Sequence, residues 1–152
     1  MSLDLSPTDA QQFQVGLQQF NQGDYYACHD TLEAIWMTAS TVEKPFFQGI
    51  LQLAVALYHL GNHNWRGTAI LLSEGIRRLE PFEPSYHGVD VTDLLDCADA
   101  WLDAVQQLGA EQVSLLAAAL TQIQQEQAAP AEMVTLPRWQ IQYGEDARET
   151  TN

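Results

Sequence analysis

Residues 45–60 read PFFQGILQLAVALYHL, and they are the most informative part of the sequence about the fold. Apolar side chains cover nearly the whole circumference of the helix that it predicts, so we expect this helix to lie at the centre of the domain. Gly61-Asn62 predicts where the helix ends. The stretch is too short, and too often interrupted by polar residues, to span a bilayer. No membrane partner is therefore expected.

The rest of the chain predicts further helices separated by short turns. Ser6-Pro7, with Asp9 in the first turn, is a typical helix start. We expect an all-α fold, a compact bundle of about six helices in antiparallel hairpins. It has a helical-repeat-like character, because Asn21-Gln22-Gly23 is echoed by Asn62-His63-Asn64. The expected helices are residues 7–20, 24–39, 45–60, 65–79, 91–108 and 110–127.

The sequence indicates one domain, residues 1–129, followed by a C-terminal tail, residues 130–152. Leu136, Trp139 and Ile141 are expected to dock the tail onto the bundle, whereas its end is expected to be poorly ordered. Residues 80–89 form the one long connection. The loop histidines, His63 and His87, are expected to be exposed.

Composition excludes several classes of function. The 152 residues hold 6 basic and 20 acidic side chains, so the formal net charge is 6 − 20 = −14. Such a chain repels phosphates, which argues against nucleic acid or an anionic membrane surface as a partner. Cys28 and Cys97 are too few and too isolated for a disulfide framework, and are expected to be reduced and buried. Without a recognisable export signal at residues 1–7, the expected location is the cytoplasm.

A polar line runs along the central helix. Gln48, Gln52 and His59 are its polar exceptions, and at about 100° per residue they lie within roughly 40° of one another. The preceding helix carries His29 and Glu33 at the edge of its apolar arc, one turn apart, so they share a face and can hold one ion or ligand.

If these two helices pack antiparallel, the polar groups can meet in a pocket between them. We expect the lining to be His29, Glu33, Gln48, Gln52 and His59, with walls formed by Tyr26, Trp36 and Tyr58. Such a lining suits a small polar ligand or a divalent metal, the one cofactor that the residues suggest. The candidate metal ligands are His29, Glu33 and His59, and Glu33 is the candidate catalytic residue.

Several alternatives stay open from the residues alone. The polar line can be a closed hydrogen-bond network with no ligand, because buried polar groups must be satisfied. The domain can be a non-catalytic module that binds another protein or its own copy as a homo-oligomer. It can also be a metal-dependent hydrolase in which Glu33 is the general base.

Two charged patterns are interpreted as structural. Helix 91–108 has an acidic side that is typical of a solvated surface, formed by Asp93, Asp96, Asp99 and Asp103. On helix 65–79, the spacing of Glu74 with Arg77 and Arg78 predicts an exposed ion pair.

From about residue 20 to residue 90 the chain resembles the family called domain of unknown function 309. The resemblance rests on a combination of short motifs, which are FNQGDYY at 20–26, CHD at 28–30, LE at 32–33, FFQGILQ at 46–52, AVA at 54–56, YH at 58–59, NWRG at 64–67 and GVD at 88–90. It implies a small all-helical fold and no particular reaction, substrate or cofactor. The choice of site residues therefore rests on periodicity.

Overall fold

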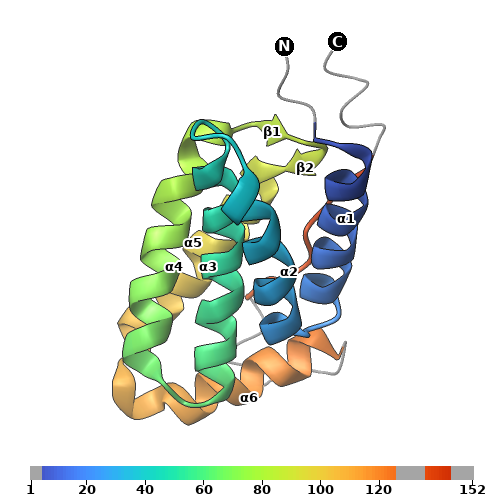
Figure 1. The fold of residues 1–152 in the computed structure, drawn as a ribbon. Helices are drawn as coiled ribbons and strands as arrows, with labels where there is room; N and C mark the ends of the chain where they lie inside the picture. The colour runs from blue at the N-terminus through green and yellow to red at the C-terminus, as the bar shows by residue number, and fades with distance from the viewer. Residues whose placement is uncertain (1–4, 126–135, 145–152) are drawn as a thin grey trace.

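The computed structural model describes residues 5–125 and 136–144. In these residues the fold is all-α, as the sequence predicts, with one short β-hairpin (Figure 1). The six α-helices are α1 (Pro7–Asn21), α2 (Tyr25–Thr38), α3 (Lys44–Gly61), α4 (Trp65–Leu79), α5 (Val91–Leu108) and α6 (Val113–Gln124). Two 3-10 turns, η1 (Glu80–Phe82) and η2 (Ala110–Gln112), precede the hairpin and α6.

Capping side chains place the helix starts where the sequence predicts them. The Ser6 hydroxyl accepts the backbone N–H of Asp9 at 3.0 Å, and the Asp90 carboxylate accepts that of Asp93 at 3.0 Å. The observed bounds of α4 and α5 equal the expected ones. Helix α6 begins later than expected, because residues 110–112 form the tighter η2 turn.

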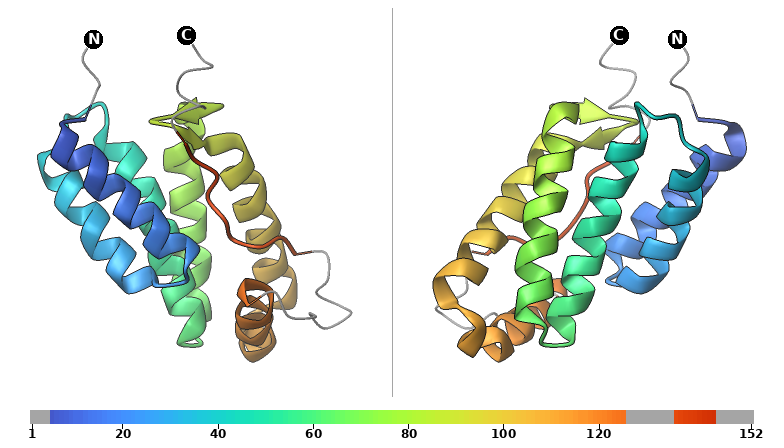
Figure 2. Two further views of the ribbon diagram at one scale, coloured as in Figure 1. Left: turned by 90° about the vertical axis from the view of Figure 1, so that its right-hand side faces the viewer. Right: turned by 60° about the vertical axis from the view of Figure 1, so that its left-hand side comes forward.

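Helix α3 lies between α2 and α4 and supplies the middle of the core (Figure 1). Helix α1 packs on α2, α5 packs on α4, and α6 crosses the end of the bundle (Figure 2). Most of α3 is buried, as its apolar circumference predicts. The largest fully buried side chains are Trp101, Trp139, Phe20, Phe46 and Phe47.

Two glycines let α3 and α4 approach closely. A Cβ added at Gly49 would lie 2.6 Å from Cγ of Leu79, and one added at Gly75 would lie 3.0 Å from the carbonyl oxygen of Gly49. The backbones of the two helices therefore nearly touch. This close packing fixes which side chains of α3 face α4 and which remain on the outside.

The connection between α4 and α5 contains a β-hairpin that the helical periodicity did not predict. Strands β1 (Ser85–Tyr86) and β2 (Val89–Asp90) pair antiparallel around His87 and Gly88. Both turn residues have positive φ, 48° at His87 and 78° at Gly88, as a two-residue turn of type I′ requires. Strands of two residues are too short to give a periodic pattern in the sequence, so this hairpin was not predicted.

Residues 136–144 cross the bundle from the end of α6 to the hairpin (Figure 2). Trp139 and Ile141 are buried, at 0% and 1% exposure, and Leu136 is half-buried. The backbone N–H of Asp90 donates to the carbonyl of Gln142, and Val89 forms a bridge with Tyr143. The expected disorder of the chain end concerns residues that, from 145 on, lie outside the described ones.

Candidate functional site

A cluster of potential metal ligands lies on the outer face of α2. His29, Asp30 and Glu33 each offer a ligand atom, and these three atoms lie within 4.8 Å of one another. The helix produces this cluster because residues one turn apart share a face. Nδ1 of His29 lies 3.2 Å from Oδ1 of Asp30, which orients the imidazole, and the two side chains are 26% and 61% exposed. Sequence reasoning found His29 and Glu33 but missed Asp30.

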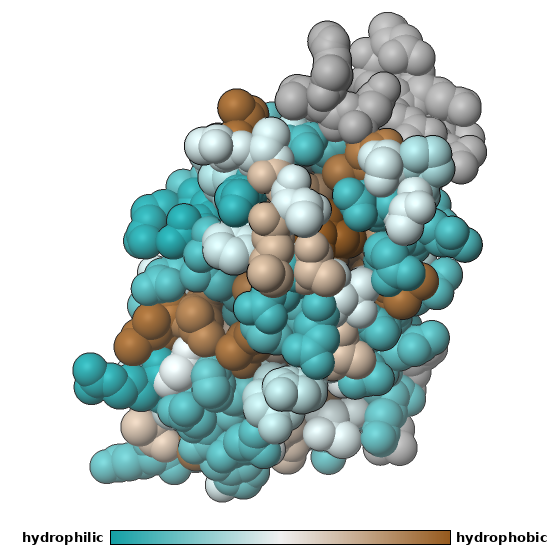
Figure 3. Space-filling view, in the orientation of Figure 1, coloured by the Kyte–Doolittle hydropathy of each residue, from teal (hydrophilic) through white to brown (hydrophobic). Residues whose placement is uncertain are grey.

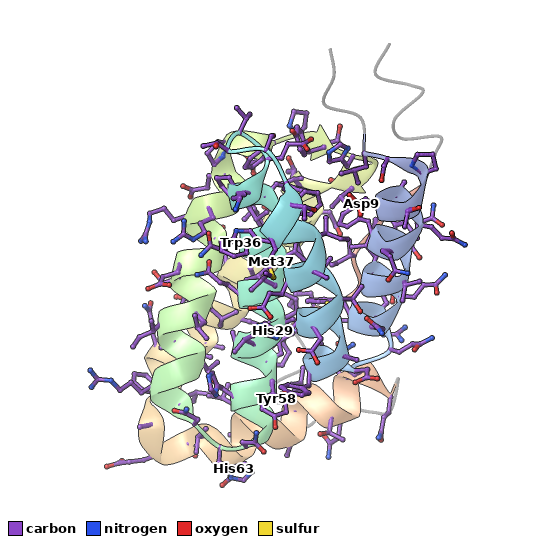
Figure 4. All side chains as sticks on the ribbon, in the orientation of Figure 1. Asp9, His29, Trp36, Met37, Tyr58 and His63 are labelled. Carbon is purple, nitrogen blue, oxygen red and sulfur yellow. The ribbon has the colours of Figure 1, made fainter. Side chains whose placement is uncertain are left out.

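Two tyrosines adjoin this cluster, as expected for the walls of a site. The ring of Tyr26 lies nearly parallel to that of His29, with centroids 6.3 Å apart, and 5.5 Å from the ring of Tyr58 on α3. Tyr26 is 60% exposed and Tyr58 is 44% exposed. Figure 4 shows His29 and Tyr58 on the same face of the bundle. The structure therefore brings four of the eight predicted residues onto an open face, namely Tyr26, His29, Glu33 and Tyr58.

Gln52 faces α4, whereas the predicted pocket requires it to face α2. It is buried, and its amide nitrogen donates to Oε1 of Glu74 at 3.2 Å while its amide oxygen accepts from Nε of Arg78 at 3.0 Å. Both partners belong to α4. The exposed ion pair expected on α4 is thus replaced by a bridge through Gln52. Both the nitrogen and the oxygen of this amide are thus bound to α4 and not to the His29 cluster.

His59 also contacts α4 rather than His29. Oδ1 of Asn64 accepts the backbone N–H of Gly67 at 3.0 Å, so the amide nitrogen of Asn64 is the atom that faces Nδ1 of His59 at 3.3 Å. An amide nitrogen donates, and Nδ1 of the neutral ring must then accept. The cluster of ligand atoms around His29 contains Asp30 and Glu33 but not His59, so the expected metal-ligand set of His29, Glu33 and His59 is not formed. His59 instead contacts the residue that caps α4.

The two remaining predicted residues lie toward the other end of the face. Trp36 packs beneath Lys44, whose Nζ lies 4.5 Å from the centroid of its ring. The indole N–H of Trp36 is buried and has no hydrogen-bond partner in the described residues. Gln48 is half-buried on α3. The eight predicted residues thus spread along α2 and α3 instead of converging on one pocket.

A second polar cluster, which the sequence did not reveal, joins the start of α3 to the hairpin. Oε2 of Glu43 lies 2.6 Å from Nε2 of His87 and accepts the hydroxyl of Tyr86 at 3.2 Å. Glu43 is only 6% exposed, and the ring of His87 stacks on Phe47. Burial and the neighbouring Glu43 carboxylate raise the pKa of Tyr86 to about 12. The expectation that His87 is an exposed loop residue is wrong; His63 is exposed, as expected.

Comparison with known proteins supports the family resemblance. Residues 13–71 match the family model of the Domain of unknown function (DUF309). The DUF309 match runs from the middle of α1 to the middle of α4, so it starts earlier and ends earlier than the motifs suggested. It contains the His29 cluster and both tyrosines. The Glu43 cluster is split, because His87 lies beyond the match.

One curated relative is similar over the same part of the chain. The uncharacterized protein YpuF of Bacillus subtilis (strain 168) is 40% identical over 58 residues, which is 38% of this chain and 33% of that protein. The chain thus covers about a third of the relative's length. No solved structure matches the chain. Among the described residues, no helix is both long and apolar enough to cross a membrane.

Proposed function

We propose that this helical domain binds a divalent metal ion on the outer face of α2, through His29, Asp30 and Glu33. The observation that carries the proposal is the mutual distance of the three ligand atoms, which is within 4.8 Å. An imidazole with two carboxylates suits borderline metals such as Zn²⁺, Mn²⁺ or Ni²⁺. Because the cluster lies on an open face, such a metal would keep coordination positions for water or a small polar ligand.

The neighbouring tyrosines support a ligand rather than a bare structural ion. Tyr26 and Tyr58 expose rings beside the cluster and would form an apolar rim for a molecule held by the metal. We do not extend the proposal to hydrolysis. In that alternative His59 is a ligand and Glu33 a base, whereas Nδ1 of His59 faces the Asn64 amide and Glu33 belongs to the ligand cluster.

Metal titration tests the proposal directly. Protein purified without chelators and without affinity-tag nickel is titrated with Zn²⁺, Mn²⁺ and Ni²⁺, while calorimetry follows binding and thermal unfolding follows stability. A ligand present at about 100 times its Kd adds roughly 2.7 kcal/mol to the free energy of unfolding, so a rise in Tm is expected. His29→Ala and Glu33→Gln should abolish both the binding heat and the rise in Tm.

The matched controls use the same residue types elsewhere on the surface. His63→Ala removes an exposed imidazole from the turn after α3, and Asp96→Asn removes an exposed carboxylate from α5; both should leave metal binding unchanged. Glu33 is exposed, so Glu33→Gln should alter the stability of the metal-free protein by less than about 0.5 kcal/mol. Equal loss of binding in the controls, or no binding by the unmodified protein, would overturn the proposal.

A further inference from the structure

The face formed by α2, α3 and α4 carries most of the exposed hydrophobic side chains. The six large hydrophobic residues that are exposed among the described ones are Val15, Tyr26, Met37, Val42, Tyr58 and Ile70. All except Val15 lie on α2, α3, α4 or the connection between α2 and α3. Figure 3 shows the result, with hydrophobic patches on this face separated by hydrophilic side chains. In a protein interface, hydrophobic side chains form the buried centre and polar side chains form the rim, and this face offers both.

Charges of opposite sign flank the hydrophobic residues on this face. Helix α2 carries Asp30 and Glu33 and no Lys or Arg, whereas α4 carries Arg66, Arg77 and Arg78. Four of the chain's six basic residues, these three and Lys44, therefore lie on α3 and α4, although the net charge is −14. In the described part of the chain, Arg66 and Arg77 form no ion pair, and neither does Glu33.

We propose that a second copy of this chain occupies this face in a two-fold symmetric dimer. Helices α2 and α4 flank α3 on opposite sides. In the proposed dimer the two copies face each other across this surface, and the two-fold axis lies in the interface, parallel to α3. Rotation about this axis places α4 of one copy against α2 of the other. Arg66 and Arg77 of each copy then meet the acidic side of α2 of the other. Tyr58 and Ile70, each 44% exposed, are buried between them.

This dimer does not depend on the metal proposal. The carboxylates of Asp30 and Glu33 belong both to the face and to the metal cluster. Association is therefore measured in the presence of EDTA, so that no ion competes with the guanidinium groups. A failure to dimerise leaves metal binding untouched, and a failure to bind metal leaves the dimer untouched.

Complementary charge reversal gives the decisive experiment. Sedimentation equilibrium is run on the full chain, on the variant Asp30→Lys/Glu33→Lys and on the variant Arg66→Glu/Arg77→Glu. Each variant opposes like charges across its own interface, so its self-association should weaken by about 100-fold or more. In a mixed dimer of the two variants, α2 of each copy and α4 of the other again carry opposite charges, at both contacts. The mixture should form a heterodimer whose Kd lies within about tenfold of that of the unmodified dimer.

A charge-matched control separates this face from a general charge effect. Asp93→Lys/Asp96→Lys changes the net charge by the same amount as Asp30→Lys/Glu33→Lys, but on the exposed side of α5. It should leave the dimer Kd within about twofold of that of the unmodified protein. Circular dichroism of every variant verifies folding. An unmodified protein that stays monomeric at high concentration, or variants that do not associate when mixed, would overturn the proposal.

Discussion

Asn21 binds both backbone groups of Ile141, a residue that follows it by 120 positions. The amide nitrogen of Asn21 donates to the carbonyl of Ile141 at 3.1 Å, and its amide oxygen accepts the N–H of Ile141 at 2.7 Å. Gln124 binds Trp139 in the same way: its amide nitrogen donates to the carbonyl of Trp139 at 3.0 Å, and its amide oxygen accepts the backbone N–H of Trp139 at 2.7 Å. Two amide side chains thus satisfy the backbone groups of Trp139 and Ile141, upstream of the point where residues 142–144 pair with the hairpin.

Replacing Asn21 by Ala should lower the free energy of unfolding by about 1–3 kcal/mol, because the backbone groups of Ile141 lose both partners. Urea unfolding measures the change. Gln22→Ala, at the adjacent exposed position, is the control and should change stability by less than about 0.5 kcal/mol. Equal effects of the two substitutions would show that the two hydrogen bonds between Asn21 and Ile141 contribute nothing to stability.

Replacing His87 by Ala should destabilise the protein by roughly 3 kcal/mol, because Glu43 is left nearly buried with only the hydroxyl of Tyr86 as a donor. Chemical unfolding of His87→Ala and of His87→Ala/Glu43→Leu tests this reason. The double variant should recover part of the loss, since it removes the buried carboxylate. A double variant less stable than the single one would contradict the argument.

Stability should fall as the pH rises from 9 to 12. Burial raises the pKa of Cys28, of Cys97 and of Tyr86 to about 12 in the folded protein, from ordinary values of 9.0 for the thiols and 10.0 for the phenol. In that range the unfolded state loses these protons and the folded state keeps them, so each group favours unfolding by at most about 1.4 kcal/mol per pH unit. Urea midpoints across this range should decline. Cys28→Ala should make the decline shallower, and an unchanged slope would count against Cys28 as a cause.

Replacing Gly49 by Ala should destabilise the bundle by about 1–3 kcal/mol, since the new methyl group would lie 2.6 Å from Cγ of Leu79 and force α3 away from α4. Gly61, near the end of the same helix, has nothing within 4 Å of an added Cβ. Gly61→Ala should therefore be neutral or stabilise the protein by up to about 1 kcal/mol. Thermal unfolding of both variants compares them; a Gly49→Ala protein as stable as Gly61→Ala would contradict the close contact of the two helices.

The helices could be predicted because their signals are local. Ser6 and Asp90 cap helices within three residues of the groups they bind, and the apolar circumference of residues 45–60 needs no knowledge of the rest of the chain. The Glu43 cluster could not be predicted in this way. Glu43 and His87 are 44 positions apart, and only the folded hairpin brings them together.

The polar line on α3 was predicted in part. Periodicity placed Gln48, Gln52 and His59 on one side of the helix, but α3 has a neighbour on each side. Gln52 and His59 face α4 because the close contact of Gly49 with Gly75 fixes how α3 is rotated about its own axis. Periodicity was applied only to α2 and α3, so the contact with α4 could not be predicted from it. The adjacent pair His29 and Glu33 could be found because both lie on one turn of one helix.

Burial of Trp139 and Ile141 has a consequence for synthesis on the ribosome. Their side chains fill the interior with 0% and 1% exposure, and Trp139 contacts Phe20 and Trp101. While the helices emerge, that part of the nascent chain's interior is still open, because the residues that close it are translated after α6. Completion of the core should therefore wait until residue 141 has left the exit tunnel, and chains released earlier should expose apolar surface to chaperones and proteases.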